Sequence, residues 1–204
     1  MIRRDHACII GGHLTEWLAA DSAKSGIALF LDFDGTLVGI CDRPEQCILS
    51  ASLRALITEL SEHPQCTVAI VSGRPTSNLK SLIAIPNIHL AGNHGLFIEG
   101  PGYQYAHPEI ASAKPRLDAV RKRLVAEVKN MPGIWIDAKP ASCALHYRQA
   151  TQKDARRARS LLSKIVQEDS FENNLRVMQG KKVLEVLPAI AWHKGEAVLW
   201  LLRR

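Results

Sequence analysis

The chain has 204 residues, 47% of them hydrophobic, with 26 basic and 20 acidic side chains and a formal net charge of +6. This apolar content predicts a folded core of one domain or two small ones, and it excludes a disordered chain. The five cysteines include no Cys-x-x-Cys pair. They therefore indicate reduced thiols of a cytoplasmic protein, not a disulfide framework or a zinc site.

The N-terminus does not predict a signal peptide, because residues 2–4, Ile-Arg-Arg, are followed by Asp5 and His6 and not by an apolar run. Asp32 and Asp34 interrupt the most apolar stretch, residues 27–40, so we do not expect it to span a membrane. The densest basic runs, residues 121–123 and 156–159, fall in segments of helical period without interleaved aromatic residues. We expect them to be solvated helix faces, since nucleic-acid surfaces combine basic and aromatic side chains. We therefore expect a soluble protein that binds neither nucleic acid nor membranes.

The first half of the chain alternates between strand and helix patterns. After a short helix at residues 13–20, residues 27–33 form a continuous apolar run, as in a strand buried on both faces of a parallel sheet. A helix at residues 50–62, a strand at 67–71, a helix from Pro75 to about residue 84 and a strand at 88–91 follow. This order predicts an α/β domain with right-handed crossovers.

The pattern changes after residues 100–102, Gly-Pro-Gly, which we expect to be a linker. Next come a helix at residues 114–129, strands at 133–137 and 142–148, a helix at 151–168, strands at 175–178 and 183–187, and a helix at 194–204. Two repeats of helix, strand and strand are typical of an α+β unit. We predict a catalytic core of residues 1–100 and 189–204, with an α+β cap domain inserted at residues 101–188.

Residues 32–36, Asp-Phe-Asp-Gly-Thr, stand at the carboxyl end of the first predicted strand, where open α/β sheets bind ligands. Residues two apart on a strand point to the same side, so the Asp32 and Asp34 carboxylates converge. One can act as a nucleophile and the other as a general acid and base, while Gly35 lets backbone N–H groups approach a phosphate. The alternative is a solvated turn.

Two further motifs fit the same chemistry. Residues 72–74, Ser-Gly-Arg, end the second strand before a helix, where a hydroxyl and amides can hold a phosphate, although an ordinary helix cap explains them equally well. Lys194 opens the last helix and could place an ammonium against the phosphate. Since two carboxylates facing a phosphate repel it, we expect Mg²⁺ bound by Asp32 and Asp34.

Together, residues 32–36, 72–74 and Lys194-Gly195 resemble the haloacid dehalogenase phosphatases. From residue 27 to the end, the chain is more similar still to the trehalose-6-phosphate phosphatase family, through residues 91–95, 136–148 and 179–188. The resemblance implies a Rossmann-like parallel-sheet core, with Asp32 as the nucleophile and Asp34 as the acid and base. It also implies that Ser72 and Lys194 hold the phosphoryl group, next to Gly73 and Arg74.

The resemblance also implies a small-molecule sugar phosphate as substrate. The residues that would bind the sugar are Asp137, Lys139, Arg148 and Glu185 of the cap, with Asn93 and His94 nearby. Without the family resemblance, an exposed cross-strand charge network would explain Lys139, Arg148 and Glu185. We expect His146 and Tyr147 to be packing residues.

Two residues depart from the family pattern: Asp137 replaces a usual glutamate and Pro140 a frequent glycine. We expect each to shift the contacts with the sugar without abolishing them.

The family continues beyond the last helix into a strand with a Gly-Asp-Asp motif that completes the metal site. This sequence stops at Arg204, so we expect a core without its C-terminal strands, in which residues 27–33 form an exposed edge.

Mg²⁺-dependent hydrolysis of trehalose 6-phosphate through an aspartyl-phosphate on Asp32 is the leading function. The alternatives are a catalytically silent remnant that binds sugar phosphate, and a phosphatase of another sugar phosphate. The oligomeric state is not predicted.

Overall fold

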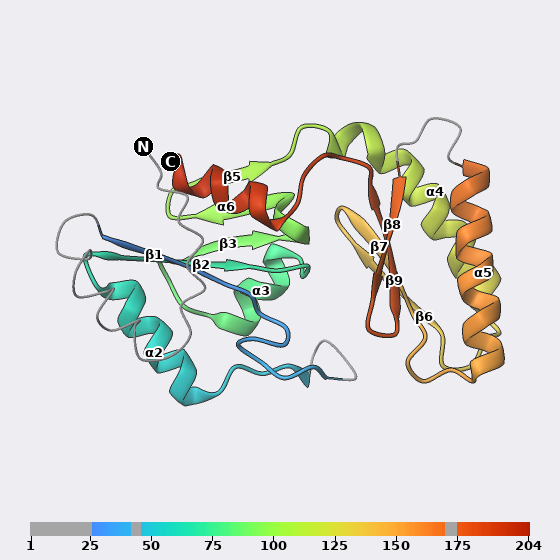
Figure 1. Ribbon diagram of the computed structural model, residues 1–204, viewed down its shortest axis with the longest axis horizontal. Helices are drawn as coiled ribbons and strands as arrows, with labels where there is room; N and C mark the ends of the chain where they lie inside the picture. The colour runs from blue at the N-terminus through green and yellow to red at the C-terminus, as the bar shows by residue number, and fades with distance from the viewer. Residues whose placement is uncertain (1–25, 42–45, 170–174) are drawn as a thin grey trace.

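The computed structural model describes residues 26–41, 46–169 and 175–204, which form two β-sheets with helices packed on them (Figure 1). The helix predicted at residues 13–20 lies outside the described residues. The first sheet has the strand order β1-β2-β3-β4-β5 and the second the order β6-β7-β9-β8. This arrangement confirms an α/β fold class.

The first sheet begins with three parallel strands, as predicted. Its elements are β1 (Ile27–Leu31), α2 (Ala51–Glu62), β2 (Cys66–Val71), α3 (Thr76–Ile83) and β3 (His89–Gly92). The helices α2 and α3 cover one face, where the fully buried Phe33, Ile57 and Ile70 form the core. The last helix, α6 (Lys194–Leu202), covers the other face (Figure 1). Within the described residues β1 pairs only with β2, so it is an edge strand.

The linker expected at residues 100–102 is instead the turn of a β-hairpin. Strands β4 (Phe97–Gly100) and β5 (Tyr103–Ala106) pair antiparallel, and the short helix η2 (Asn93–Gly95) precedes them. Pro101 and Gly102 connect the two strands, and Gly102 has a φ of +77°, the left-handed backbone that favours glycine in tight turns. The sheet is therefore mixed rather than wholly parallel, and it extends past residue 100 to Ala106. The division into core and cap stays a prediction.

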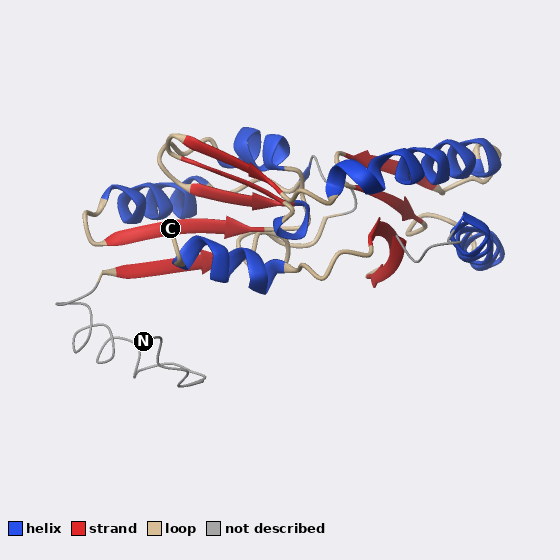
Figure 2. Ribbon diagram, turned by 90° about the horizontal axis from the view of Figure 1, so that it is seen from above, coloured by secondary structure: helices blue, strands red, loops and turns tan. Residues whose placement is uncertain are grey.

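The second sheet is antiparallel throughout. Its elements are α4 (Ile110–Val128), β6 (Trp135–Lys139), β7 (Ser142–His146), α5 (Gln152–Asp169), β8 (Leu175–Gly180) and β9 (Val183–Pro188). Both helices pack on one face of this sheet, where Leu124, Leu145 and Leu162 are fully buried. The other face lies toward the carboxyl ends of the parallel strands of the first sheet (Figure 2). This orientation places the predicted sugar-binding residues opposite the predicted catalytic ones.

The chain crosses between the two sheets twice, from β5 to α4 and from β9 to α6 (Figure 1). The second crossing returns the chain to the first sheet and brings Lys194 beside residues that are far from it in sequence. Among the helices that the structure describes, none combines the length and the apolar character needed to cross a membrane.

Replacing Gly92 by alanine tests how closely the segments behind the candidate site are packed. A Cβ at Gly92 would lie 2.5 Å from the backbone nitrogen of Thr76 and 2.7 Å from the carbonyl oxygen of Arg74. Since backbone atoms cannot move aside alone, we expect Gly92→Ala to lower the free energy of unfolding by about 1–3 kcal/mol, measured by urea denaturation. Gly39→Ala is the control, because a Cβ there has no atom within 4 Å. Equal stability of the two variants would contradict the close packing.

Candidate active site

Polar residues that follow the three parallel strands meet at one edge of the first sheet. Asp32 follows β1, Ser72 follows β2, and Asn93 and His94 form η2 after β3. The carboxyl ends of parallel strands lie at the same edge, so these side chains are brought together by topology. The same edge faces the second sheet.

Lys194 and Asp32 form an ion pair across 162 residues of sequence. The Lys194 Nζ donates to Asp32 Oδ1 at 2.6 Å, and the backbone N–H of Phe33 donates to the same oxygen at 3.0 Å. His193 caps α6, since its Nδ1 accepts from the backbone N–H groups of Gly195 and Glu196, and this fixes where Lys194 begins the helix. The two paired side chains are 39% and 44% exposed, so the pair is open to a ligand and adds little stability.

Arg74 holds Asp34 with two parallel hydrogen bonds. Its Nε donates to Asp34 Oδ2 at 2.8 Å and its Nη2 to Oδ1 at 2.7 Å, while Nη1 donates to Asn78 Oδ1 at 3.0 Å. Burial disfavours the charged guanidinium, but the hydrogen bonds and negative charge of Asp34 outweigh it and raise the pKa of Arg74. The guanidinium also lies 5.2 Å from the ring centroid of Phe33. The predicted substrate ligand Arg74 is thus also the residue that orients Asp34.

The loop after β2 and the turn after β3 are interlocked by backbone hydrogen bonds. The N–H of His94 donates to the Ser72 carbonyl at 2.9 Å, and the N–H of Asn93 to the Arg74 carbonyl at 2.8 Å. The Ser72 side chain is 1% exposed, and its Oγ accepts from the Arg74 backbone N–H at 3.2 Å. A Cβ at Gly73 would lie 2.8 Å from Cε1 of His94, so the glycine is what allows the imidazole to approach.

The buried side-chain amide of Asn93 lacks hydrogen-bond partners within the described part of the chain. Its side chain is fully buried, and neither Oδ1 nor Nδ2 has a hydrogen-bond partner among the residues that the structure describes. Its φ of +48° is a left-handed conformation that asparagine tolerates better than most residues. An unsatisfied buried amide costs about 1–3 kcal/mol, so a polar group supplied from outside would be stabilised there.

A buried carboxylate, that of Glu185 on β9, joins the two sheets. Its Oε1 accepts from Lys139 Nζ at 2.9 Å and Ser142 Oγ at 2.5 Å, both on the second sheet, and its Oε2 lies 3.2 Å from His94 Nε2 on the first. Lys139 also reaches the Gly73 carbonyl, at 3.4 Å. Burial acts to raise the pKa of Glu185, but His94 and Lys139 together lower it to about 2. Since Glu185 is only 7% exposed, an exposed charge network is the wrong description of this cluster.

A cavity of about 430 Å³ lies between the two sheets. Asp34, Gly73 and Arg74 line it from the first sheet, and Asp137, Lys139 and Arg148 from the second. Arg148 Nη2 donates to the Lys181 carbonyl at 3.1 Å. Of the six predicted sugar-binding residues, Asp137, Lys139 and Arg148 thus line this cavity, whereas Glu185, Asn93 and His94 are not among its lining residues.

An aromatic pair also lines this cavity. Trp135 and His146 are opposite each other in the β6–β7 ladder, and their rings stack with centroids 3.8 Å apart and planes 3° apart. His146 thus packs on Trp135, as expected, and it also lines the cavity, whereas Tyr147 is buried in the core as predicted. The broad face of a tryptophan in a polar cavity is suited to packing against a sugar ring.

The sequence held signals for three residues that our interpretation missed. Ser142 is the cross-strand neighbour of Lys139 in the β6–β7 hairpin, so the register of that hairpin would have placed it near Glu185. Asn78 stands four residues after Arg74, the spacing of side chains that meet on one helix face. Trp135 is the cross-strand neighbour of His146.

Asp32 and Asp34 match the ligand type that Mg²⁺ prefers. Mg²⁺ is commonly held by one or two carboxylates together with water and substrate phosphate oxygens. Asp32 and Asp34 can supply the carboxylates. Within residues 26–41, 46–169 and 175–204, no three or more histidine, cysteine or acidic side chains form a metal-binding group.

The lowered pKa of Glu185 predicts acid sensitivity. Its pKa falls from 4.5 to about 2 on folding, so its contribution to stability is present above pH 4.5 and is lost as the pH falls toward 2. We expect Glu185→Gln to be less stable at pH 7, by roughly 3 kcal/mol at most, and the difference to shrink between pH 4.5 and 2. Urea denaturation across this pH range measures it. A difference independent of pH would contradict the assignment.

Comparisons with known proteins show which family the chain resembles. The family model described as trehalose-phosphatase matches residues 30–204. The probable trehalose-phosphate phosphatase 4 of Oryza sativa subsp. japonica is 32% identical over 92% of this chain and 50% of its own length. The trehalose-phosphate phosphatase of Mycobacterium ulcerans is 33% identical over 86% of this chain and 44% of its own. The chain thus spans about half the length of these curated relatives.

A solved structure shares the fold. The C-terminal domain of the trehalose-6-phosphate phosphatase of C. albicans superposes with a TM-score of 0.74 at 28% identity, over 93% of this chain and 66% of that one. Together with the family model, this similarity confirms the predicted haloacid dehalogenase fold. The chain therefore belongs to the trehalose-phosphatase family.

Proposed function

We propose that this protein hydrolyses trehalose 6-phosphate to trehalose and phosphate. The observation that carries the proposal is the pairing of Lys194 with Asp32, at 2.6 Å, next to the Asp34–Arg74 pair and a cavity whose opposite wall is polar. A nucleophile, a second carboxylate and a fixed cation are the groups that phosphoryl transfer through a covalent intermediate requires.

In the proposed reaction, an oxygen of Asp32 attacks phosphorus and the bond from phosphorus to the sugar oxygen breaks. Asp34 gives a proton to the departing sugar oxygen, and Arg74 keeps its carboxyl group aimed at that position. Asp34 then takes a proton from a water whose oxygen attacks the aspartyl-phosphate, which releases phosphate and restores Asp32. The ammonium of Lys194 and the hydroxyl of Ser72 would hold the phosphoryl oxygens.

Mg²⁺ bound by Asp32 and Asp34 would offset the repulsion between the carboxylates and the phosphate dianion. The ammonium of Lys194 also offsets this repulsion, because it lies within hydrogen-bond distance of Asp32. The protein's own contribution is to keep the two carboxylates and the ammonium in fixed positions while the phosphate enters.

Sugar recognition is assigned to the cavity wall formed by the second sheet. Asp137, Lys139 and Arg148 line this wall and offer donors and acceptors for hydroxyls. Glu185, which is bound to Lys139 and His94, adds an acceptor next to them. In the structure Glu185 is satisfied by protein groups, so sugar hydroxyls would exchange with these bonds rather than find bare charges. The unsatisfied amide of Asn93 favours a polar partner in the same region.

The nucleophile is tested by Asp32→Asn. We expect Mg²⁺-dependent release of phosphate from trehalose 6-phosphate by the 204-residue chain, and a loss in Asp32→Asn to the level of a sample without enzyme. Asp34→Asn should lose about a hundred- to ten-thousandfold in kcat. Asp118→Asn is the control, because Asp118 is on the outer surface of α4 with Lys114 and Arg121.

Three results would count against this proposal. A folded chain that binds trehalose 6-phosphate without releasing phosphate would be a silent remnant. Faster release from another sugar phosphate would identify a different substrate. Retained activity in Asp32→Asn would remove the nucleophile from the mechanism.

The packing of a sugar ring on Trp135 is tested by Trp135→Ala. If a sugar ring packs on Trp135, the variant should raise KM for trehalose 6-phosphate by roughly two- to tenfold, in line with the usual strength of aromatic stacking. Turnover of p-nitrophenyl phosphate, which has no sugar, should stay unchanged. Trp135→Phe keeps an aromatic face and should restore most of the affinity. An equal loss with both substrates would mean that Trp135 only supports the fold.

A further inference from the structure

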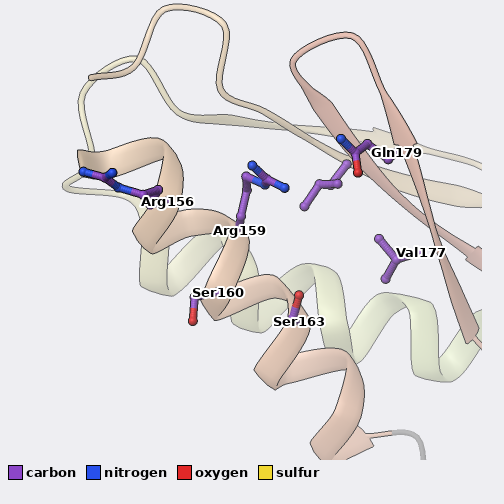
Figure 3. Close-up of a pocket in the computed structure, with 7 residues that line it drawn as sticks. Arg156, Arg159, Ser160, Ser163, Val177 and Gln179 are labelled. Carbon is purple, nitrogen blue, oxygen red and sulfur yellow. The ribbon is translucent and has the colours of Figure 1, made fainter. Parts of the chain in front are cut away.

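A second cavity, of about 370 Å³, lies between α5 and the strand β8 (Figure 3). The side chains that line it and are labelled in Figure 3 are Arg156, Arg159, Ser160, Ser163, Val177 and Gln179. None of them has a part in the reaction proposed above. The two arginines belong to the basic run that we expected to be an ordinary solvated helix face.

The periodicity of α5 explains why these residues gather. Residues 156, 159, 160 and 163 follow the spacing i, i+3, i+4 and i+7, so they form one stripe along the helix. The neighbouring stripe is apolar, and its residues Ala158, Leu162 and Ile165 are fully buried against the second sheet. The polar stripe therefore runs along the margin of that core, beside the edge strand β8.

Strand register puts this cavity and the candidate active site on opposite faces of one sheet. Gln179 pairs with Leu184, a core residue beneath the helices, whereas the next residue, Glu185, points to the other face. Val177 and Gln179 are two apart on β8 and so lie on the helix side with Leu184. A ligand in the second cavity would thus be separated from the Glu185 cluster by the thickness of a single sheet.

The charges around the cavity have one sign. Two arginines line it, and none of the lining residues is acidic. In Figure 3 the end of the Arg156 side chain points away from Gln179. Neither Arg156 nor Arg159 forms an ion pair with a residue of the described part of the chain. Arg159 lies 5.8 Å from the ring centroid of Tyr147. Figure 3 shows its side chain extending from α5 toward β8, where Gln179 lies.

We propose that this cavity binds the phosphate group of a small phosphorylated molecule. Arg159 offers a planar fork of N–H donors that matches phosphate oxygens, and Arg156 adds a second positive charge at the margin of the cavity. The Ser163 hydroxyl and the Gln179 amide add uncharged donors. Val177 and Leu184 provide an apolar floor for the rest of the ligand. The volume is within the range of small-molecule sites, which begins at about 300 Å³.

The test is a titration of the ¹⁵N-labelled chain with sodium phosphate, followed by NMR at the amides of Ser163 and Gln179, against sodium chloride at equal ionic strength. We expect a saturable shift with phosphate only. Arg159→Ala should weaken binding by about ten- to a hundredfold, as expected for lost charged hydrogen bonds. Arg157→Ala is the matched control, since it removes the same charge from an exposed position of α5 that does not line the cavity.

The titration is repeated in Lys194→Ala, which weakens phosphate binding at the candidate active site and leaves α5 intact. Persistence of the Gln179 shift there separates the two sites, and its loss would overturn the proposal. No saturable shift, or equal weakening by Arg157→Ala and Arg159→Ala, would also overturn it. Gln179→Ala gives a second variant whose substitution is on β8, so the conclusion does not depend on one helix.

Glucose 6-phosphate and adenosine monophosphate, titrated in the same way, distinguish the sources of the phosphate group. Tighter binding of either organic ester than of inorganic phosphate would mean that the apolar floor contributes. Equal affinity would identify free phosphate as the ligand.

Discussion

The buried carboxylate of Glu185 is the interaction on which the arrangement of this protein depends. It accepts hydrogen bonds from Lys139 and Ser142 on its own sheet and pairs with His94 on the other. An ionised group that is 7% exposed is tolerated only when it is paired and hydrogen-bonded. The pairing of this charge therefore links the second sheet to the edge of the first, together with the Lys139–Gly73 hydrogen bond and the buried cluster that contains Leu96 and Ala141.

The two carboxylates that we propose as catalytic, Asp32 and Asp34, are held in different ways, which suits their different proposed roles. Asp34 is clamped by Arg74 through two hydrogen bonds, and Arg74 is itself buried on the ring of Phe33. Asp32 is 44% exposed and shares one oxygen with Lys194, so a phosphate can reach it. A rigid acid and base beside an accessible nucleophile is an arrangement that positions a proton without blocking the entering phosphate.

The second sheet presents different chemistry on its two faces because strand residues alternate. Glu185 on one face and Leu184 on the other are adjacent in sequence, yet one belongs to the candidate active site and the other to the helix-covered core. The same alternation on β8 places Gln179 beside the arginines of α5. A single antiparallel sheet thus separates the region assigned to the sugar from a cavity suited to a second anion.

The sequence by itself determined the helices and strands that depend on local residue patterns. The apolar runs and helical periods predicted β1 to β3, α2, α3 and α5 to within a few residues, and they placed Asp32 directly after the first strand. The β4–β5 hairpin was missed, because two short strands around Pro101 and Gly102 resemble a linker until Tyr103 and Tyr105 are seen packed near Trp200.

Only the tertiary structure decided which distant residues meet. It paired Arg74 with Asp34, His94 with Glu185 and Lys194 with Asp32, across 40, 91 and 162 residues of sequence. It also turned a basic run on α5 into the wall of a cavity. These contacts depend on chain crossings and strand register, which are set by packing of the whole chain and not by any local stretch of it.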